Sequence, residues 1–386
     1  MLTVEEALSA IEGVVVPLPT LRVPLADSLG LVLAEAGVAD LDSPPFDKSL
    51  MDGYAVRSED VARAPVELRI IEEVLAGGVP RKALAAGDAT KIMTGAPIPA
   101  GADAVVPVEQ TVMAANGAPP RVTISVAIAS GRNILKRGES TRAGDTVVPQ
   151  GRLIRAMEVG CLAELGRHTV KVVRRPRVAV LATGDELVPI TEKPGPGQIR
   201  NSNEAMLVAQ LRQAGVDAFG LGIARDDKHD LRSKIEQGLK YDVLVLSGGV
   251  SAGQVDLVPL VLAEAGVTQI FHKVRVKPGQ PLWFGLLDRG RPATVPLAPA
   301  FIESSKDRCY VFGLPGNPVS SLVCCELFVR TALRKLAGVT PSRRPPVLAR
   351  LSVEHRNSGS RPTYHPVQLS ETAEGLLVAP VRWIGS

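Results

Sequence analysis

Four short loops between residues 177 and 330 each follow directly after an apolar run of β type. They occupy residues 182–187, 247–251, 277–281 and 313–320, and each contains glycine, proline or acidic residues. In an open α/β sheet, ligands bind outside the carboxyl ends of the strands, where loops of this kind gather. We therefore expect the four loops to line one anion-binding cleft.

Strand-type and helix-type patterns alternate around these loops. The sequence predicts β segments at residues 178–182, 218–223, 242–246, 269–276 and 310–313. It predicts helices at residues 203–214, 230–238, 255–265 and 318–336, and Gly215 and Gly266 are placed to end two of them. Continuous apolar strands that alternate with capped helices indicate a parallel sheet covered on both faces.

The residues before 175 follow a different pattern. Thr3 and Glu6 have the spacing of a capping box, which predicts a helix over residues 3–12. Between residues 38 and 145, short β-type pieces are broken by Gly and Pro clusters, which is typical of an all-β module. A helical pattern returns at residues 155–165 and is expected to end at Gly166. The β module is therefore predicted to be an insertion in a discontinuous first domain.

These patterns together predict a multidomain α/β protein with four parts. The parts are a discontinuous helical linking domain (1–45 and 141–174), an inserted β-rich domain (46–140), a parallel α/β sandwich (175–340) and a small C-terminal β domain (341–386). The last part begins with a proline-rich linker at residues 341–346.

Composition excludes several classes of function. Aromatic residues make up only 3% of the 386 residues, and a net charge of +4 is spread among nearly as many acids, so a nucleic-acid partner is not expected. No apolar run reaches the about 20 residues that cross a bilayer, and the N-terminus lacks the pattern of a signal peptide. The four cysteines have neither metal-ligand nor disulfide spacing. We therefore expect a cytoplasmic protein with reduced thiols and no membrane partner.

Acidic residues near the loops suggest a metal site. Asp185 and Glu186 follow the first strand, Asp226 follows the second, and Asp256 lies after the glycine pair Gly248 and Gly249. Carboxylates together with a phosphate are the usual ligands of Mg²⁺, and glycines let backbone amides approach an anion. Two alternatives stay open: Asp226 and Asp227 could cap the next helix, and the glycine pair could form only a tight turn.

Basic and proline residues in the other two loops allow a second set of contacts. Lys273 and Lys277 are four residues apart on a β-type segment, so they are expected on one face, either as a solvated edge or as an anion clamp. Asn317 and Pro318 fit the start of a helix. Pro315 has no such local role and suggests a loop held in a fixed shape for a ligand.

Five separated motifs resemble the molybdopterin molybdenumtransferases, the molybdenum-cofactor assembly family that includes the E domain of gephyrin. They are Ser-Pro-Pro-Phe-Asp-Lys-Ser-Leu-Met-Asp-Gly-Tyr-Ala-Val at residues 43–56, the segment 92–106, Thr-Gly-Asp-Glu-Leu at 183–187, Ser-Gly-Gly-Val-Ser at 247–251 and Gly-Leu-Pro-Gly-Asn-Pro-Val-Ser at 313–320. The resemblance implies a sandwich of the molybdopterin-binding type and a four-domain homodimer. It also implies a cytoplasmic, Mg²⁺-dependent transferase that joins molybdate to adenylylated molybdopterin and releases AMP.

The resemblance also implies roles for individual residues. The cleft acids would be Glu186, Asp226 and Asp256, with Asp185, Glu186 and Asp256 as metal ligands, and Asp52 and Thr94 would complete the site from a second protomer. The substrate contacts would be Gly248, Gly249, Ser251, Lys273, Lys277, Pro281, Pro315, Pro318 and Arg361. Molybdopterin adenylyltransferase and recipient molybdoenzymes are the partner proteins that the resemblance implies.

The chain departs from the family pattern at three positions that bear on activity. Lys48 stands where the family commonly has Asn, Ser140 where it has an acid, and Gln280 where it has a lysine. Ser140 and Gln280 favour an alternative, a molybdopterin- or cofactor-binding carrier with weak turnover. A dimeric scaffold is a further alternative.

Overall fold

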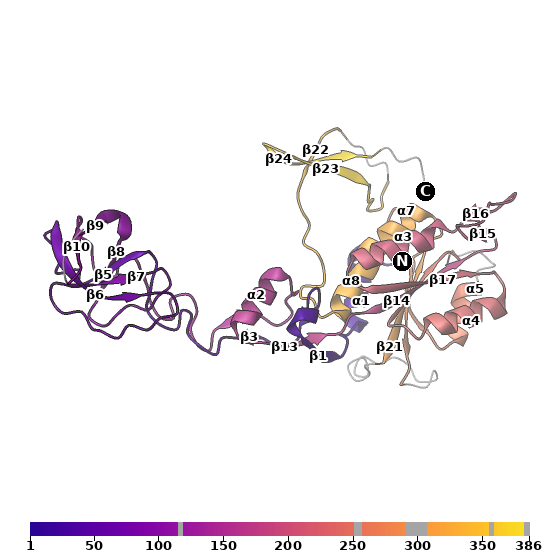
Figure 1. Cartoon of the computed structure of the whole chain (residues 1–386). Helices are drawn as coiled ribbons and strands as arrows, with labels where there is room; N and C mark the ends of the chain where they lie inside the picture. Colours follow the sequence, from indigo (N-terminus) through magenta and orange to yellow (C-terminus); the bar gives the residue numbers. More distant parts are fainter. Residues whose placement is uncertain (115–118, 251–256, 291–306, 355–358, 382–386) are drawn as a thin grey trace. The chain divides into compact units, whose positions relative to one another are not determined.

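A computed structural model describes residues 1–114, 119–250, 257–290, 307–354 and 359–381 (Figure 1). Internal contacts divide the chain into two compact units. The first unit comprises residues 1–35, 150–159 and 168–386, and the second comprises residues 36–149 and 160–167. The α/β part of the first unit and the β-rich second unit are described separately below.

A six-stranded sheet forms the centre of the first unit, in the order β17-β14-β18-β21-β20-β19. The strands are β14 (Arg177–Thr183), β17 (Asp217–Ala224), β18 (Val243–Ser247), β19 (Thr268–His272), β20 (Trp283–Asp288) and β21 (Arg308–Leu314). The first four strands in the order are parallel, whereas β20 runs antiparallel to both β21 and β19. The predicted α/β class is confirmed, but the sheet is mixed because of β20, which the sequence patterns did not predict.

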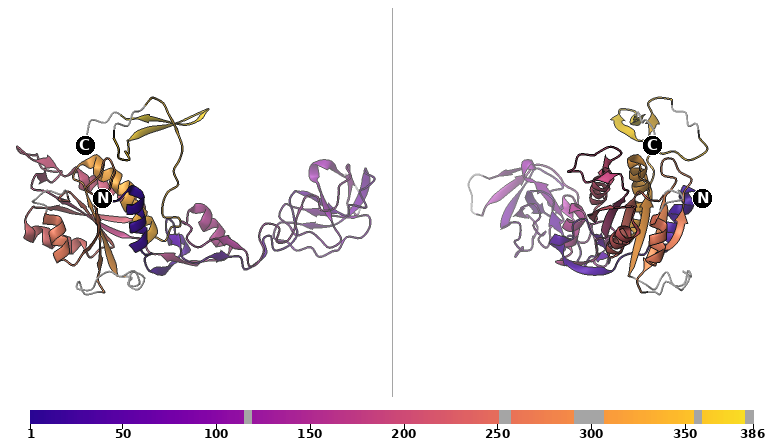
Figure 2. Two further views of the ribbon diagram at one scale, coloured as in Figure 1. Left: turned by 180° about the vertical axis from the view of Figure 1, so that it is seen from behind. Right: turned by 90° about the vertical axis from the view of Figure 1, so that its right-hand side faces the viewer.

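Helices cover both faces of this sheet (Figure 2). Alternate residues of β14 point to opposite sides: Val178 and Val180 pack in one core, while Ala179 and Leu181 pack in the other. The first core includes α1 (Val4–Val14), α3 (Ser202–Gln213), α7 (Pro318–Cys324) and α8 (Arg330–Leu336), and the second includes α4 (Lys228–Gly238) and α5 (Leu257–Glu264). The expectation of a sheet covered on both faces is confirmed.

Two local expectations need correction. The predicted continuous helix over residues 318–336 contains a π-helical turn, Cys325–Val329, between α7 and α8. The predicted β segment over residues 269–276 ends at His272, and Lys273 has a φ of 71°. The prediction that Lys273 and Lys277 share one face of a strand is therefore wrong, because no strand joins them.

Helix starts and ends follow the sequence more closely. The side chain of Thr3 accepts from the N–H of Glu6, and the Glu6 carboxylate accepts from the N–H of Thr3, so the predicted capping box of α1 is confirmed. Helix α2 (Ala156–Glu164) is followed by Gly166 at a φ of 69°. Within the described residues, no helix is both long enough and apolar enough to cross a membrane.

The second unit contains the predicted β module. Its main sheet has the order β8-β5-β7-β6-β10-β9. The strands are β5 (Gly53–Val56), β6 (Val66–Val74), β7 (Asp88–Ile92), β8 (Ala104–Pro107), β9 (Thr111–Met113) and β10 (Arg121–Ile124). Two short pairs accompany it, β4 (Lys48–Ser49) with β11 (Ile134–Leu135) and β3 (Gly37–Val38) with β12 (Thr146–Val148).

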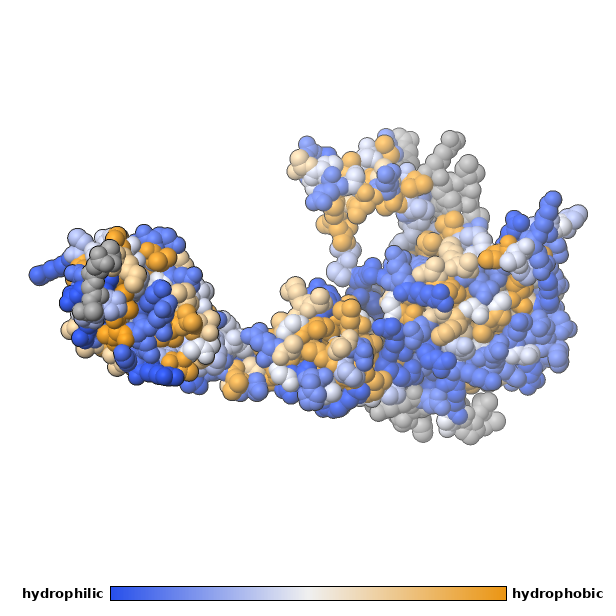
Figure 3. Space-filling model, viewed as in Figure 1, coloured by the Kyte–Doolittle hydropathy of each residue, from blue (hydrophilic) through white to orange (hydrophobic). Residues whose placement is uncertain are grey.

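Smaller sheets complete the first unit. One consists of β1 (Thr20–Pro24), β13 (Thr169–Val173) and β2 (Val32–Leu33), and a pair consists of β15 (Leu187–Val188) and β16 (Ile199–Arg200). The C-terminal sheet consists of β22 (Arg350–Leu351), β24 (Gly375–Pro380) and β23 (Val367–Thr372). Leu351 and Leu369 of this sheet are exposed, and Figure 3 shows apolar side chains on its surface.

Three of the four cysteines are buried, in agreement with the expected reduced thiols. Burial raises the pKa of Cys309 and Cys324 to about 12, and it also raises the pKa of Cys325. A thiol with such a pKa stays protonated and unreactive at neutral pH.

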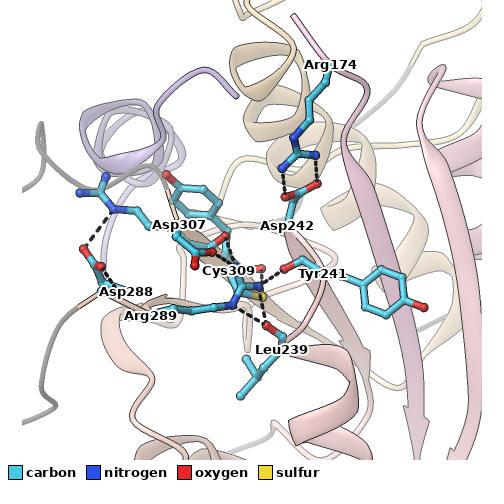
Figure 4. A network of polar contacts seen from close by, with 11 residues as sticks. Arg174, Leu239, Tyr241, Asp242, Asp288, Arg289, Asp307 and Cys309 are labelled. Carbon is cyan, nitrogen blue, oxygen red and sulfur yellow. Dashed lines mark hydrogen bonds and ion pairs between the residues drawn. The ribbon is translucent and has the colours of Figure 1, made fainter. Parts of the chain in front are cut away.

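An ionic network joins the amino ends of β14 and β18 (Figure 4). Arg174 donates through Nη1 and Nη2 to the two carboxylate oxygens of Asp242, at 2.7 and 2.6 Å. The N–H of Arg177 donates to the same carboxylate at 2.8 Å, and Asp242 raises the pKa of Arg174. Nearby, Arg289 donates to the carbonyl oxygens of Leu239 and Tyr241, which follow α4. The network therefore connects β14 and β18 at their amino ends, which lie at the edge of the sheet opposite to the predicted cleft.

This network gives a test of stability. We expect Asp242→Asn to lower the free energy of unfolding by about 2 kcal/mol, because it breaks a charge-assisted pair whose acid is buried. The control is Asp217→Asn, whose exposed carboxylate lies 3.9 Å from the neighbouring Arg175. This change should cost no more than about 0.5 kcal/mol. Urea unfolding followed by circular dichroism measures the free energy of unfolding of both variants. Equal losses would contradict a stabilising role of the Arg174–Asp242 pair.

Candidate functional site

A cavity of about 440 Å³ opens at the carboxyl ends of β14, β18 and β21. Each of the four predicted loops contributes to its wall, although the third contributes only Pro281. The lining residues are Ala182, Thr183, Gly184, Glu186, Leu187, Ile199, Arg200, Asn201, Ser202, Asn203, Asp226, Ser247, Gly248, Gly249, Val250, Leu257, Val258, Pro281, Pro315, Gly316 and Pro318. The common cleft expected from the sequence is therefore present.

The glycine pair is needed for close packing at this wall. Gly248 and Gly249 have φ values of 99° and 63°, which L side chains rarely adopt. A Cβ atom at Gly248 would lie 2.6 Å from the carbonyl oxygen of Thr183, and one at Gly249 would lie 2.6 Å from Cγ2 of Val258. The N–H of Gly248 donates to the carbonyl oxygen of Leu314 at 3.1 Å, so this amide holds the loop to β21.

Two acidic residues line the cavity, and the side chain of Asp185 holds the backbone of one of them. Glu186 and Asp226 both line the wall. Oδ1 of Asp185 accepts from the N–H of Asp226 at 3.1 Å, so the Asp185 side chain holds the second acidic loop against the first. Arg225 adds to this link by donating to the carbonyl oxygens of Asp185 and Leu187, at 3.1 and 3.0 Å.

The capping alternative for Asp226 does not hold. The N-cap of α4 is Asp227, whose side chain accepts from the N–H groups of His229 and Asp230, both at 3.0 Å. Asp226 is thereby left to line the cavity.

The donor set suits a magnesium ion that is shared with a substrate. Glu186 and Asp226 supply two carboxylates, and Mg²⁺ is commonly held by one or two carboxylates together with phosphate oxygens. In the described part of the chain, this cavity included, no group of three or more His, Cys, Asp or Glu side chains is placed to hold a metal alone. The predicted contacts Asp256 and Ser251 lie outside the described residues.

The fourth loop is fixed by asparagines on both sides. Oδ1 of Asn317 accepts from the N–H groups of Val319 and Ser320, at 3.0 and 3.2 Å, and Pro318 occupies the first turn of α7. Nδ2 of Asn203 donates to Oγ of Ser247 at 2.8 Å and to the carbonyl oxygen of Gly316 at 2.7 Å. Asn203 therefore connects α3 with the loops after β18 and β21, and holds Pro315 and Pro318 at the cavity wall.

The predicted cationic contacts lie apart from the cavity wall. Lys273, Lys277 and Arg361 are absent from the described lining. The N–H of Lys277 donates to the carbonyl oxygen of Pro362 at 2.9 Å. The N–H of Tyr364 donates to the carbonyl oxygen of Lys277 at 2.8 Å. Nη1 of Arg361 donates to Oε1 of Gln280. The C-terminal segment is therefore attached to the third loop, whose last residue, Pro281, reaches the cavity.

The second unit brings Asp52 and Thr94 together. Oδ1 of Asp52 accepts from the N–H and the hydroxyl of Thr94, at 2.7 and 2.8 Å. These two hydrogen bonds hold the pKa of the Asp52 carboxyl below its usual value. The aspartate is therefore ionised and fixed in orientation at neutral pH.

Sequence reasoning gave no role to six polar residues of the cavity wall, which are Thr183, Arg200, Asn201, Ser202, Asn203 and Ser247. Asn201, Ser202 and Asn203 form a polar run at the start of α3, and Asn201 is its N-cap. A polar run at the start of a helix, after a turn that contains glycine, was the available signal.

Two family models match most of the chain. Residues 2–166 match the model of the MoeA N-terminal region (domain I and II). Residues 179–335 match the model of a probable molybdopterin binding domain. The two matches divide the chain between the N-terminal segments and the α/β sheet that carries the cavity.

Curated relatives and solved structures agree with these matches. The chain is 36% identical to a molybdopterin molybdenumtransferase of Staphylococcus aureus and 37% identical to one of Nostoc sp.. Both alignments cover 87% of this chain, with 76% and 74% of the respective relatives. Two crystal structures of a molybdopterin biosynthesis moeA protein from Pyrococcus horikoshii each have a TM-score of 0.77, at 32% and 28% identity. The matches cover 99% and 100% of this chain, and 90% and 91% of those chains.

The close packing of the glycine pair gives a test of the site. We expect Gly249→Ala to lower the free energy of unfolding by about 3 kcal/mol, because left-handed strain is combined with overpacking against Val258. Gly197 is a matched control, since it has a φ of 74° but a Cβ added there would meet no atom within 4 Å. Gly197→Ala should cost only about 1 kcal/mol. If urea titration gives the same loss for both variants, the wall is not tightly packed at Gly249.

Proposed function

The chain belongs to the molybdopterin molybdenumtransferase family, and on that basis we propose that it transfers molybdenum from molybdate to adenylylated molybdopterin, with release of AMP. The product is the molybdenum cofactor. The observation that carries the proposal is the convergence of Glu186, Asp226 and the loop containing Pro315 and Pro318 on one cavity. This cavity lies within residues 179–335, the part that matches a molybdopterin binding domain.

The residues of the wall suit the handling of two anionic substrates. Glu186 and Asp226 would hold Mg²⁺ together with phosphate oxygens, and the ion would polarise the phosphoanhydride. Asn203 keeps the fourth loop in place, so that Pro315 and Pro318 present a rigid surface to the pterin. The ionised Asp52, oriented by Thr94, is proposed to contribute from a second protomer.

The departure at Gln280 is compatible with an active enzyme. Gln280 brings no charge to the third loop, but its Oε1 accepts from the guanidinium of Arg361. A cation from the C-terminal segment is therefore held at the loop where the family pattern has a lysine. This contact keeps Arg361 at the third loop, but the resemblance already implies Arg361 in addition to that lysine, so the loop still has one positive charge fewer. The release of AMP therefore decides between transfer and the carrier alternative.

The decisive experiment measures AMP release. Purified protein is incubated with adenylylated molybdopterin and Mg²⁺, with and without molybdate, and AMP is quantified by chromatography. We expect AMP release to depend on molybdate and to fall by about 100-fold or more in Glu186→Gln and Asp226→Asn, since metal ligation contributes several kcal/mol to such reactions. Glu236→Gln, on the exposed surface of α4, is the matched control and should keep full activity.

Other outcomes would point to other functions. Tight binding of adenylylated molybdopterin without release of AMP would establish the carrier alternative. Equal AMP release with and without molybdate would contradict a transfer of molybdenum. Homodimer formation, dependence on Mg²⁺, the partner proteins and a cytoplasmic location remain predictions of the family resemblance.

The proposed role of a second protomer can be tested by mixing variants. Asp52→Ala and Glu186→Gln are each expected to be inactive. If each site draws on two protomers, co-expression of the two variants should restore about a quarter of wild-type activity, because half of the dimers are mixed and each mixed dimer has one intact site. Co-expression of Asp52→Ala with Thr94→Ala is the control and should restore nothing, since every site keeps a defect. Absence of recovery in the first mixture would contradict the shared site.

A further inference from the structure

Arg200 is the basic residue of the cavity wall. Among the described lining residues it is the single Lys or Arg, whereas Glu186 and Asp226 supply two carboxylates. The proposed substrates, a phosphoanhydride and molybdate, are both anions. Two carboxylates repel such anions unless a cation is also present. Lys273 and Lys277 do not line the cavity, so they do not supply this positive charge. Arg200 is the residue that brings it to the wall.

The backbone of Arg200 is fixed beside the first acidic loop. Strand β16 pairs with β15, so that Arg200 lies opposite Val188. The N–H of Ile199 donates to the carbonyl oxygen of Glu186 at 2.8 Å, and the N–H of Asn201 donates to that of Val188 at 2.9 Å. Arg200 is thereby held by the same segment that presents the Glu186 carboxylate, and the two groups reach the cavity from neighbouring backbone positions.

Most of the hydrogen-bonding capacity of the Arg200 side chain is unused. Nε donates to the carbonyl oxygen of Glu192 at 3.0 Å, which orients the guanidinium. Nη1 and Nη2 have no partner in the part of the chain that the structure describes. A guanidinium anchored through Nε still offers two terminal nitrogens, which can donate in parallel to two oxygens of one anion.

The neighbouring groups add donors for the same anion. Ser202 and Asn203 line the cavity and lie in the first turn of α3, where backbone N–H groups have no intrahelical acceptor. Thr183 also belongs to the wall. This residue is 3% exposed, and its buried Oγ1, which lies next to Gly248 and Gly249, has no hydrogen-bond partner among the described atoms. The start of a helix also carries a partial positive charge that favours a phosphate.

From this geometry we propose that Arg200 binds a phosphate of the adenylylated substrate, beside the first turn of α3. The assignment rests on the proposed function, because it names the part of that substrate which this side of the cavity receives. A planar guanidinium fits two phosphate oxygens at once, which a lysine ammonium does not. Arg200 is therefore a substrate-binding residue that sets the affinity for the phosphoanhydride.

Steady-state kinetics of Arg200→Gln and Arg200→Lys test the assignment. We expect Arg200→Gln to raise the KM for adenylylated molybdopterin by about 10- to 100-fold, the loss typical of a hydrogen-bonded charge contact. The KM for molybdate should stay unchanged, and Arg200→Lys should recover only part of the loss. Arg232→Gln removes an exposed arginine of α4 that pairs with Glu236, and it serves as the matched control. Unchanged thermal midpoints establish that the variants fold.

Different outcomes separate this proposal from the proposed function. A rise in the KM for molybdate alone would show that Arg200 binds the other anion, and an unchanged KM for both substrates would show that it binds neither. Either result overturns the assignment while AMP release by the wild type still supports the transferase. If the wild type releases no AMP, calorimetric titration with AMP and with inorganic pyrophosphate replaces the kinetics. Weaker binding of these probes to Arg200→Gln than to the wild type would sustain the phosphate contact, and equal binding would refute it.

Discussion

Parallel pairing of β14, β18 and β21 is the constraint on which the site depends. Parallel strands all end at the same edge of a sheet, so loops that are more than a hundred residues apart in the sequence meet there. The acidic loop after β14, the glycine pair after β18 and the proline loop after β21 are neighbours for this reason alone. Each strand is buried on both faces, which leaves the loops as the place where polar chemistry can be accommodated.

The two ends of the sheet use polar groups in different ways. At the amino ends, Nη1 and Nη2 of Arg174 donate to the two carboxylate oxygens of Asp242, so these charged groups are paired with each other. At the carboxyl ends, Asp185 and Asn203 use their hydrogen bonds to fix loops, while Glu186 and Arg200 keep charge at the wall. A network that is internally satisfied stabilises the fold, and one that keeps unused donors and acceptors is suited to a ligand.

Much of this fold could be predicted from the sequence, and the elements that could not be predicted were missed for physical reasons. Apolar runs and capping residues predicted the parallel strands and the start of α1, because both depend on local patterns. Strand β20 escaped prediction because it pairs antiparallel with β21 through contacts that no local pattern specifies. The π-turn at Cys325–Val329 escaped because one extra residue in a helical turn leaves the apolar pattern almost unchanged.

The basic residues show most clearly why the side chains of a site cannot be located from sequence spacing alone. Lys273 and Lys277 were expected on one face only on the assumption of a continuous strand, and a single left-handed residue, Lys273 itself, removes that assumption. Arg200 offered no spacing signal, yet pairing with β15 brings it to the wall beside Glu186. The acids were easier because each directly follows a strand of the parallel set. Arg200 could therefore be assigned to the site only after the pairing of β15 with β16 was known.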